Sequence, residues 1–179
     1  MNKILFLDID GVLNSSDWYS SDDAQELRHI KSDNEDRKNY KFHFDPRKVD
    51  LLSQIIDSTD CQIVISSSWR KNRTVEKLQE IFKIVGFSYP EKIVGSTDVF
   101  YSWLKEGVHC SSVRGLEIRV WLEKNREFVN PLYAKTYRYC ILDDNSDMLL
   151  DQQNNFVKCT NQEGLTLELA NRVIQILNK

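Results

Sequence analysis

Short apolar runs alternate with helical patterns along the chain. Residues 4–7, 63–65 and 139–142 are continuous apolar runs that end in polar residues, a pattern typical of strands buried on both faces. Residues 93–94 and 156–157 are weaker strand candidates. The alternation of strands and helices predicts a three-layer, Rossmann-like α/β fold, with a central parallel sheet of about five strands and helices on both faces.

Start signals mark the helices between these strands. Asp45 is a candidate N-cap and is followed by Pro46, which suits the first helical position. Thr74 and Thr166 each precede a segment with apolar residues at helical spacing, and a further helix is centred on residues 118–122. These patterns predict four helices that pack on the sheet.

One segment breaks the alternation. Residues 15–41 are rich in Asp, Glu, Lys, Ser and Asn and have too few apolar residues to form a core of their own. The segment follows the first strand, and ligands of such sheets bind at the carboxyl ends of the strands. We therefore expect a small flap or cap over the site, and a passive mobile loop is the alternative.

Composition limits the class of protein. The 179 residues, 41% of them hydrophobic, suit one domain over residues 1–179. A net charge of −3 argues against a histone-like, nonspecific binder of nucleic acid. No apolar stretch is long enough to span a membrane, and the first apolar run lacks a signal-peptide cleavage site, so we expect a cytoplasmic protein.

The cysteines and histidines do not suggest a zinc site. Cys61, Cys110, Cys140 and Cys159 lie far apart and form no CxxC pair. The three histidines show no metal-ligand spacing such as HxxxH. We expect reduced thiols in the core.

Three predicted strands end in polar clusters. The clusters comprise Asp8 and Asp10, residues 66–67, and the segment 143–147 with its three aspartates. In a parallel sheet these ends converge, and so many carboxylates would repel one another without a cation. Oxygen ligands of this kind suit Mg²⁺. Each cluster taken alone could be a turn or a helix cap, but the three together favour a metal site.

These motifs resemble those of the haloacid dehalogenase (HAD) superfamily. Phe-Leu-Asp8-Ile-Asp10-Gly-Val resembles its first motif, Ile-Val-Ile-Ser66 its second, and Leu-Asp143-Asp144-Asn-Ser-Asp147 its fourth. Their order and spacing fit nearly the whole chain, so the resemblance implies a HAD fold.

A narrower resemblance rests on softer motifs. Ser-Ser-Trp69-Arg70, the segment Arg114-Gly-Leu-Glu-Ile-Arg-Val-Trp-Leu and Gly164-Leu-Thr are similar to the HAD domain of Swiss Army Knife RNA repair proteins.

The superfamily resemblance implies a covalent mechanism. Asp8 would attack phosphorus and form an aspartyl-phosphate. Asp10 would protonate the leaving oxygen and then deprotonate the attacking water. Ser66 would donate a hydrogen bond to the phosphoryl oxygens.

The resemblance also implies a Mg²⁺ site. Its ligands would be Asp8, the backbone carbonyl of Asp10, and Asp143. Asp147 matches a further acidic position and would orient a metal-bound water. The role of Asp144 stays open.

The third motif, normally a Lys or Arg, has no clear signature here. Arg114 is the best candidate, because it opens a helix before the strand that carries Asp143 and its guanidinium could grip phosphate. Lys124 and Lys135 are weaker candidates. The alternative is that Arg114 is an exposed arginine on a helix face.

A basic and aromatic segment follows the second motif. Trp69, Arg70, Lys71 and Arg73 stand beside Ser67, and all five are candidates to bind substrate. Cations at a helix start oppose the helix dipole, so the helix does not explain them. An aromatic ring with cations suits a nucleotide or a single-stranded end, although Trp69 as a core residue is an equal alternative.

Together these residues predict a Mg²⁺-dependent phosphatase. In the superfamily, a small cap leaves the site open to bulky phosphate esters, so the expected partner is a phosphorylated nucleic-acid end, such as a 3′-phosphate, or a nucleotide, and not a membrane. One alternative is a phosphatase of small metabolites, closed by the flap. Another is a noncatalytic phosphoacceptor or binding module, although receiver domains carry their acceptor Asp on a later strand.

Overall fold

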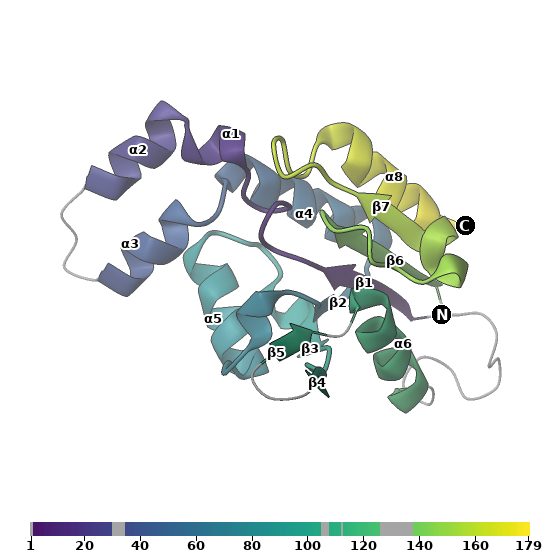
Figure 1. Ribbon diagram of the computed structural model, residues 1–179. Helices are drawn as coiled ribbons and strands as arrows, with labels where there is room; N and C mark the ends of the chain where they lie inside the picture. Colours follow the sequence, from purple (N-terminus) through teal and green to yellow (C-terminus); the bar gives the residue numbers. More distant parts are fainter. Residues whose placement is uncertain (1, 30–34, 105–107, 112, 126–137) are drawn as a thin grey trace.

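A five-stranded parallel sheet forms the centre of the computed structural model, which describes residues 2–29, 35–104, 108–111, 113–125 and 138–179 (Figure 1). The strand order is β3-β2-β1-β6-β7. This arrangement confirms the predicted α/β fold, including both weaker strand candidates. The strands are β1 (Lys3–Leu7), β2 (Gln62–Ile65), β3 (Ile93–Ser96), β6 (Arg138–Asp143) and β7 (Phe156–Lys158).

The predicted helix starts are confirmed. The side chains of Asp45, Thr74 and Thr166 each accept a hydrogen bond from a backbone N–H in the first turn that follows. The helices are α1 (Ser16–Tyr19), α2 (Asp22–His29), α3 (Glu35–Phe42), α4 (Pro46–Thr59), α5 (Val75–Ile84), α6 (Arg114–Lys124) and α8 (Leu167–Asn178).

Helices cover both faces of the sheet. Helices α4, α5 and α8 pack on the face to which Leu5 and Leu7 of β1 point. Helix α6 packs on the other face, against Ile4 and Phe6, and the ring of Trp121 lies 5.4 Å from that of Phe6. Because both faces of β1 are buried, its sequence is a continuous apolar run and not an alternating one.

The polar segment after β1 folds into α1, α2 and α3, which lie beyond the carboxyl end of β1 (Figure 1). Trp18 anchors the segment: its side chain is 2% exposed and its Nε1 donates to the backbone oxygen of Phe42. The backbone of α1 is also tied to the loop after β7, because the N–H of Ser16 donates to the oxygen of Asn161. A few apolar anchors thus hold a segment that has no core of its own.

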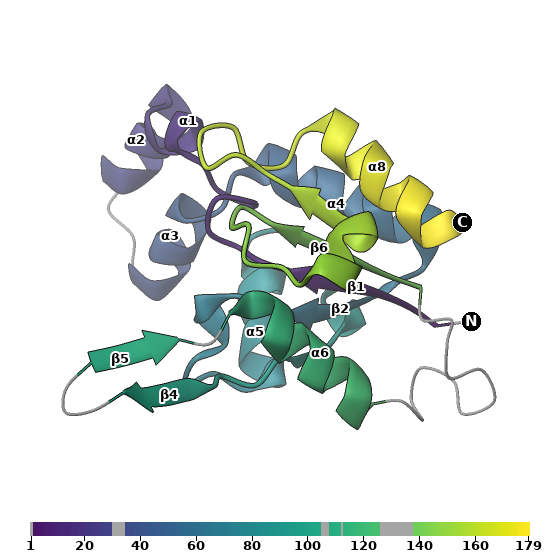
Figure 2. The same cartoon turned by 45° about the vertical axis from the view of Figure 1, so that its right-hand side comes forward.

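A second insertion, which the sequence analysis missed, lies between β3 and α6. It is an antiparallel hairpin of β4 (Tyr101–Leu104) and β5 (Val108–Ser111), and it projects away from the sheet in Figure 2. The sequence does carry a signal for it. Two runs of strand-forming residues are separated by three residues that include Gly107, a typical hairpin spacing.

The cysteines agree with the expected core thiols where the structure describes them. Cys61, Cys140 and Cys159 are free and buried, whereas the side chain of Cys110, like the whole of Lys135, lies outside the described residues. Among the described helices, none is long and apolar enough to cross a membrane.

Gly164 and Gly86 allow a test of the contact between the loop after β7 and the turn that follows β1. Both have positive φ, +69° and +92°, so alanine at either position should cost about 1–2 kcal/mol in backbone strain. A Cβ at Gly164 would also lie 2.8 Å from the backbone oxygen of Val12, whereas one at Gly86 meets nothing within 4 Å. We expect Gly164→Ala to lower the free energy of unfolding by about 1–3 kcal/mol more than Gly86→Ala does, measured by urea denaturation. Equal losses would contradict this contact.

Candidate active site

Three aspartates meet where β1 and β6 end side by side. Asp8 directly follows β1 and its backbone N–H donates to the oxygen of Leu142 in β6, so the two strands place Asp8 beside Asp143. Carboxylate oxygens of Asp8, Asp143 and Asp144 all lie within 4.8 Å of one another. The predicted convergence of the first and fourth motifs is therefore present.

Burial makes this cluster electrostatically costly. Asp8 is 4% exposed and Asp143 is fully buried. Burial, and next the negative charge of Asp8, raises the pKa of Asp143 to about 7. Burial also raises the pKa of Asp8, against the opposing effects of the Arg114 charge and of a hydrogen bond from Ser67. The pKa of the half-buried Asp144 is raised as well, again mainly by burial.

The cluster has the properties of a divalent-cation site. Oδ2 of Asp143 is buried and accepts no hydrogen bond within the described part of the chain. Carboxylates are hard oxygen ligands of the kind that Mg²⁺ prefers, and a cation between them would offset their mutual repulsion. The residues present therefore fit Mg²⁺, with Asp144 in the cluster where the sequence left its role open.

Gly11 lets Asp144 approach the loop after β1. Its φ is +70°, and a Cβ at this position would lie 2.3 Å from Oδ2 of Asp144. Glycine adopts this conformation without strain and leaves room for the carboxylate. The Asp-Gly pair after β1 thus supports the cluster sterically as well as chemically.

Arg114 lies beside the cluster from the start of α6. Its Nε is 3.4 Å from Oδ2 of Asp143, and its Nη1 is 3.8 Å from Oε2 of Glu117. The side chain is 15% exposed, so this guanidinium is neither fully buried nor a freely solvated residue of a helix face. Its position beside Asp8 and Asp143 is what a phosphate-binding arginine requires.

Asp147 lies outside the three-carboxylate cluster. Its Oδ2 accepts a hydrogen bond from the backbone N–H of Arg114 at 2.8 Å, and its backbone oxygen accepts one from Gly115. Helix α6 has no side-chain cap of its own at Val113, so Asp147 supplies the cap from another part of the chain. In this structure Asp147 contacts the element that carries Arg114, and not the cation cluster.

Asp10 lies at the exposed rim of the same site. Its carboxylate accepts hydrogen bonds from the indole Nε1 of Trp69 and from Nδ2 of Asn14. Tyr19 lines the same wall, and burial together with the charge of Asp10 raises its pKa to about 12, so its hydroxyl stays neutral.

The two serines at the end of β2 point to different surroundings. The hydroxyl of Ser67 lies near Asp8 and acts to lower the pKa of that carboxyl, and it also accepts a hydrogen bond from the backbone N–H of Trp69. The hydroxyl of Ser66 is buried and has no hydrogen-bond partner among the described residues. Side chains alternate along an extended chain, so only one of two neighbours can face Asp8. The structure places Ser67 beside Asp8, and the predicted hydrogen bond from Ser66 to a phosphoryl oxygen stays a prediction.

The basic segment after β2 divides into buried and exposed residues. Arg70 is 7% exposed, and its Nη2 lies 2.5 Å from Oε2 of Glu117 while its Nε donates to the oxygen of Thr97. This guanidinium is directed into the protein and joins the end of β2 to α6. Arg73 is exposed, lies over the ring of Trp69 at 5.3 Å and donates to its backbone oxygen. Lys71 is exposed.

An open cleft of about 350 Å³ exposes the candidate site. It adjoins a second hollow of about 300 Å³, and Ser68, Arg114 and Asn145 line both. Lys71 lines the second hollow. The first is lined by Asp8, Asp10, Gly11, Asn14, Tyr19, Ser68, Arg114, Asp144, Asn145 and Asn161.

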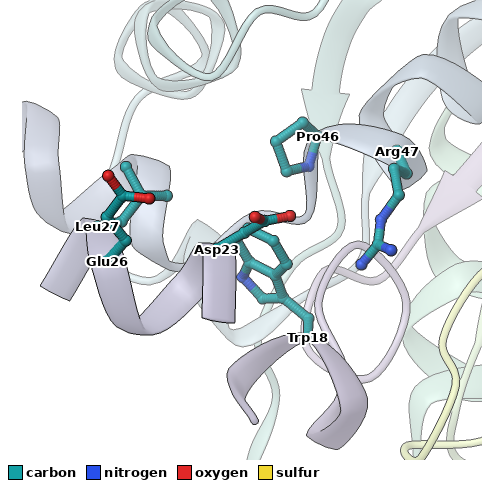
Figure 3. Close-up of a pocket in the computed structure, with 6 residues that line it drawn as sticks. All are labelled: Trp18, Asp23, Glu26, Leu27, Pro46 and Arg47. Atoms are coloured by element: carbon teal, nitrogen blue, oxygen red, sulfur yellow. The ribbon is translucent and has the colours of Figure 1, made fainter. Parts of the chain in front are cut away.

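A separate hollow of about 380 Å³ lies between the insertion and the start of α4 (Figure 3). None of its lining residues is a predicted site residue, so it lies outside the candidate active site. These residues are Trp18, Asp23, Glu26, Leu27, Pro46 and Arg47.

Asn14, Ser68 and Asn161 also line the cleft but were not predicted from the sequence. Asn14 could have been found, because the chain turns helically after Asp8 and residues four apart then share a face, which pairs Asn14 with Asp10. Asn161 comes from the loop after β7 and carries no comparable local signal.

The raised pKa of Asp143 predicts how stability depends on pH. Between its ordinary value of 3.8 and about 7, the folded chain holds a proton that the unfolded chain releases. The free energy of unfolding of the metal-free protein should therefore fall as pH rises through this window. Asp143→Asn has no carboxyl group at this position, so this pH dependence should be lost. At pH 8 the Tm of the variant should exceed that of the wild type by about 2–4 °C per kcal/mol of relieved repulsion.

The same Tm measurement tests for binding of Mg²⁺. At pH 8, Mg²⁺ should raise the Tm of the wild type but not that of Asp143→Asn, because the cation binds only the folded site. Asp50→Asn, a change at an exposed residue of α4, is the control for loss of one negative charge. Identical pH profiles for the wild type and Asp143→Asn would contradict the assignment.

Comparison with known proteins gives one match. The family model described as "HAD domain in Swiss Army Knife RNA repair proteins" matches residues 4–170. Comparisons with curated proteins and with solved structures found no match. The family supports HAD-type phosphatase activity on a phosphorylated substrate in general, and HAD domains generally use Mg²⁺. Since the match covers nearly the whole chain and the three-aspartate cluster lies where its motifs meet, the chain belongs to the family of HAD domains found in Swiss Army Knife RNA repair proteins.

Proposed function

We propose that this protein is a Mg²⁺-dependent phosphatase that forms an aspartyl-phosphate on Asp8 and acts on phosphorylated nucleic-acid ends or nucleotides. The observation that carries the proposal is the cluster of Asp8, Asp143 and Asp144. Asp8 and Asp144 line an open cleft, together with Asp10 at its rim and Arg114. This arrangement provides a nucleophile, a cation site, a proton-transfer group and a phosphate-binding cation within one cleft.

Asp8, Asp143 and Asp144 would hold Mg²⁺, together with the backbone carbonyl of Asp10 that the family resemblance implies. The bound cation supplies charge neutralisation between the carboxylates and the phosphoryl oxygens. Arg114 adds a positive charge from α6, and the hydroxyl of Ser67 would turn from Asp8 to a phosphoryl oxygen. The buried carboxylates are thus prepared to receive an anion that they would otherwise repel.

The reaction proceeds in two displacements. A carboxylate oxygen of Asp8 forms a bond to phosphorus while the bond from phosphorus to the leaving oxygen breaks, and the carboxyl proton of Asp10 passes to that oxygen. The alcohol leaves. Water then attacks phosphorus, Asp10 takes its proton, and the bond between phosphorus and Asp8 breaks. The products are an alcohol and inorganic phosphate, and both aspartates return to their starting states.

The second hollow supports a substrate larger than a phosphoryl group. It continues the cleft past Ser68, Arg114 and Asn145 and is lined by Lys71. A chain of nucleotides whose last phosphate lies at Asp8 could place a neighbouring phosphate there. A cation on an exposed surface is suited to such a sequence-independent contact.

Asp8→Asn tests the covalent mechanism. The amide is almost isosteric but a poor nucleophile, so release of phosphate from p-nitrophenyl phosphate with Mg²⁺ should fall by at least about 10³-fold. Exposed Asp50→Asn should keep wild-type turnover, and EDTA should abolish the turnover of both active proteins. If Asp8→Asn retained a tenth of the activity, Asp8 would not be the nucleophile.

Lys71→Ala tests the class of substrate. For a 3′-phosphorylated oligonucleotide, KM should rise and the slope of log affinity against log salt should lose about 0.7, the value for one phosphate contact on a single strand. Turnover of p-nitrophenyl phosphate and of a nucleoside 3′-monophosphate should not change, since neither has a second phosphate. Lys83→Ala, at an exposed lysine in the last turn of α5, is the control. Equal effects of Lys71→Ala on all three substrates would favour small metabolites instead.

A further inference from the structure

Three side chains donate hydrogen bonds to the carboxylate of Asp10, two of them at close distance. Nε1 of Trp69 lies 3.1 Å from Oδ1 and 3.1 Å from Oδ2 of Asp10, so the indole N–H is shared between both oxygens. Nδ2 of Asn14 donates to Oδ1 at 3.1 Å, and the hydroxyl of Ser68 lies 3.4 Å from Oδ2. Oδ1 thus has two close donors, whereas Oδ2 has one close donor and one distant hydroxyl.

The orientation of the Asn14 amide is fixed by its other contacts. Its Oδ1 accepts from the backbone N–H of Gly11 at 2.8 Å, and its Nδ2 also donates to the backbone oxygen of His43 at 3.2 Å. If the amide were flipped, Nδ2 of Asn14 would face the N–H of Gly11, donor against donor, and its Oδ1 would face the backbone oxygen of His43, acceptor against acceptor. Asn14 is 2% exposed, so water cannot readily replace these partners. Nδ2 of Asn14 therefore points to Asp10.

The ring of Trp69 is engaged on several sides. Its centroid lies 5.2 Å from that of Phe44 and 5.9 Å from that of His43, and the guanidinium of Arg73 lies over it at 5.3 Å. Packing against these neighbours holds the half-buried indole in place. Its indole N–H donates to Asp10, which lines the cleft.

We propose that Trp69 and Asn14 are positioning residues that orient the carboxyl group of Asp10 for proton transfer. Both residues donate to Oδ1, whereas Oδ2 has the shared N–H of Trp69 and the more distant hydroxyl of Ser68, so we assign to Oδ2 the exchange of a proton with the leaving oxygen. The proposal rests on the proposed function, because it assigns Asp10 the acid and base roles described above. It gives Trp69 a role other than the two that the sequence suggested, stacking on a substrate and packing in the core.

The two close donors also connect Asp10 to the insertion. Asn14 bonds the backbone of His43, which directly follows α3, and Trp69 packs on the rings of His43 and Phe44. The hydroxyl of Tyr19, in α1, contacts Nδ1 of His43. The insertion therefore supports Asp10, the proposed acid and base, through Asn14 and Trp69.

The test compares two substrates of nearly the same shape. The leaving oxygen of p-nitrophenyl phosphate departs without a proton, whereas that of phenyl phosphate depends more on protonation. The quantity measured is kcat/KM with Mg²⁺, because it reports the first displacement, in which the leaving group departs.

Trp69→Phe removes the N–H but keeps an aromatic ring among the same neighbours. We expect kcat/KM for phenyl phosphate to fall about tenfold, as for loss of one hydrogen bond to a charged group, with p-nitrophenyl phosphate within about twofold of the wild type. Trp121→Phe, at a tryptophan of α6 that packs on Phe6, should leave both substrates unchanged. A purely structural role of Trp69 would lower both substrates equally.

A second variant tests the same role if Trp69→Phe does not fold. Replacement of Trp69 by 3-benzothienylalanine substitutes sulfur for the N–H in a ring of almost the same size, and it should give the same selective loss for phenyl phosphate. Equal kcat/KM ratios for the two substrates in the wild type and in a folded variant would overturn the positioning role while the phosphatase proposal stands. No turnover by the wild type itself would overturn the phosphatase proposal.

Discussion

Repulsion among buried carboxylates is the constraint on which this site depends. Asp8, Asp143 and Asp144 are held close together at the ends of two neighbouring strands, with little water to screen them. The parallel pairing of β1 with β6 fixes the backbone of the first two, so side-chain movement alone cannot separate them. In the function proposed above, this cost is offset because the same geometry would bind a cation and, with it, an anionic phosphoryl group.

Several structural features serve this cluster. Gly11 leaves space for Asp144, and Arg114 brings a positive charge that lowers the pKa of Asp8 and Asp143 against the effect of burial. Asp147 caps the helix that carries Arg114. The buried pair of Arg70 and Glu117 joins the end of β2 to the same helix, and breaking such a pair typically costs about 3–5 kcal/mol. Helix α6 is therefore held at both the β2 and the β6 side of the site.

The insertion after β1 contributes to the site mainly through the residues that follow α3. Its helices are polar, but Trp18, Phe44 and the ring of Trp69 give its two ends apolar anchors. His43, at the end of the insertion, contacts Asn14, Tyr19 and Trp69, all of which lie at the rim beside Asp10. The segment thus supports Asp10, the proposed acid and base, while the cleft beside it stays open.

The sequence by itself determined the sheet, the main helices and the approximate site. Buried strands have continuous apolar runs, and helix starts have local caps, so β1, β2, β6 and the starts at Asp45, Thr74 and Thr166 could be found from neighbouring residues alone. The convergence of the first and fourth motifs followed from parallel topology, because the carboxyl ends of such strands lie at one edge. The hairpin of β4 and β5 was missed although its signal is local.

Tertiary structure alone decided what the side chains around the carboxylates contact. Composition could not show that Arg70 turns inward to Glu117, that Asp147 caps α6, or that Ser67 lies beside Asp8. It also could not show that Trp69 donates its N–H to Asp10. Each of these contacts joins residues far apart in the sequence or depends on which way a strand end faces. Such contacts are fixed only when the helices and strands pack, because no local pattern specifies the partner across the cleft.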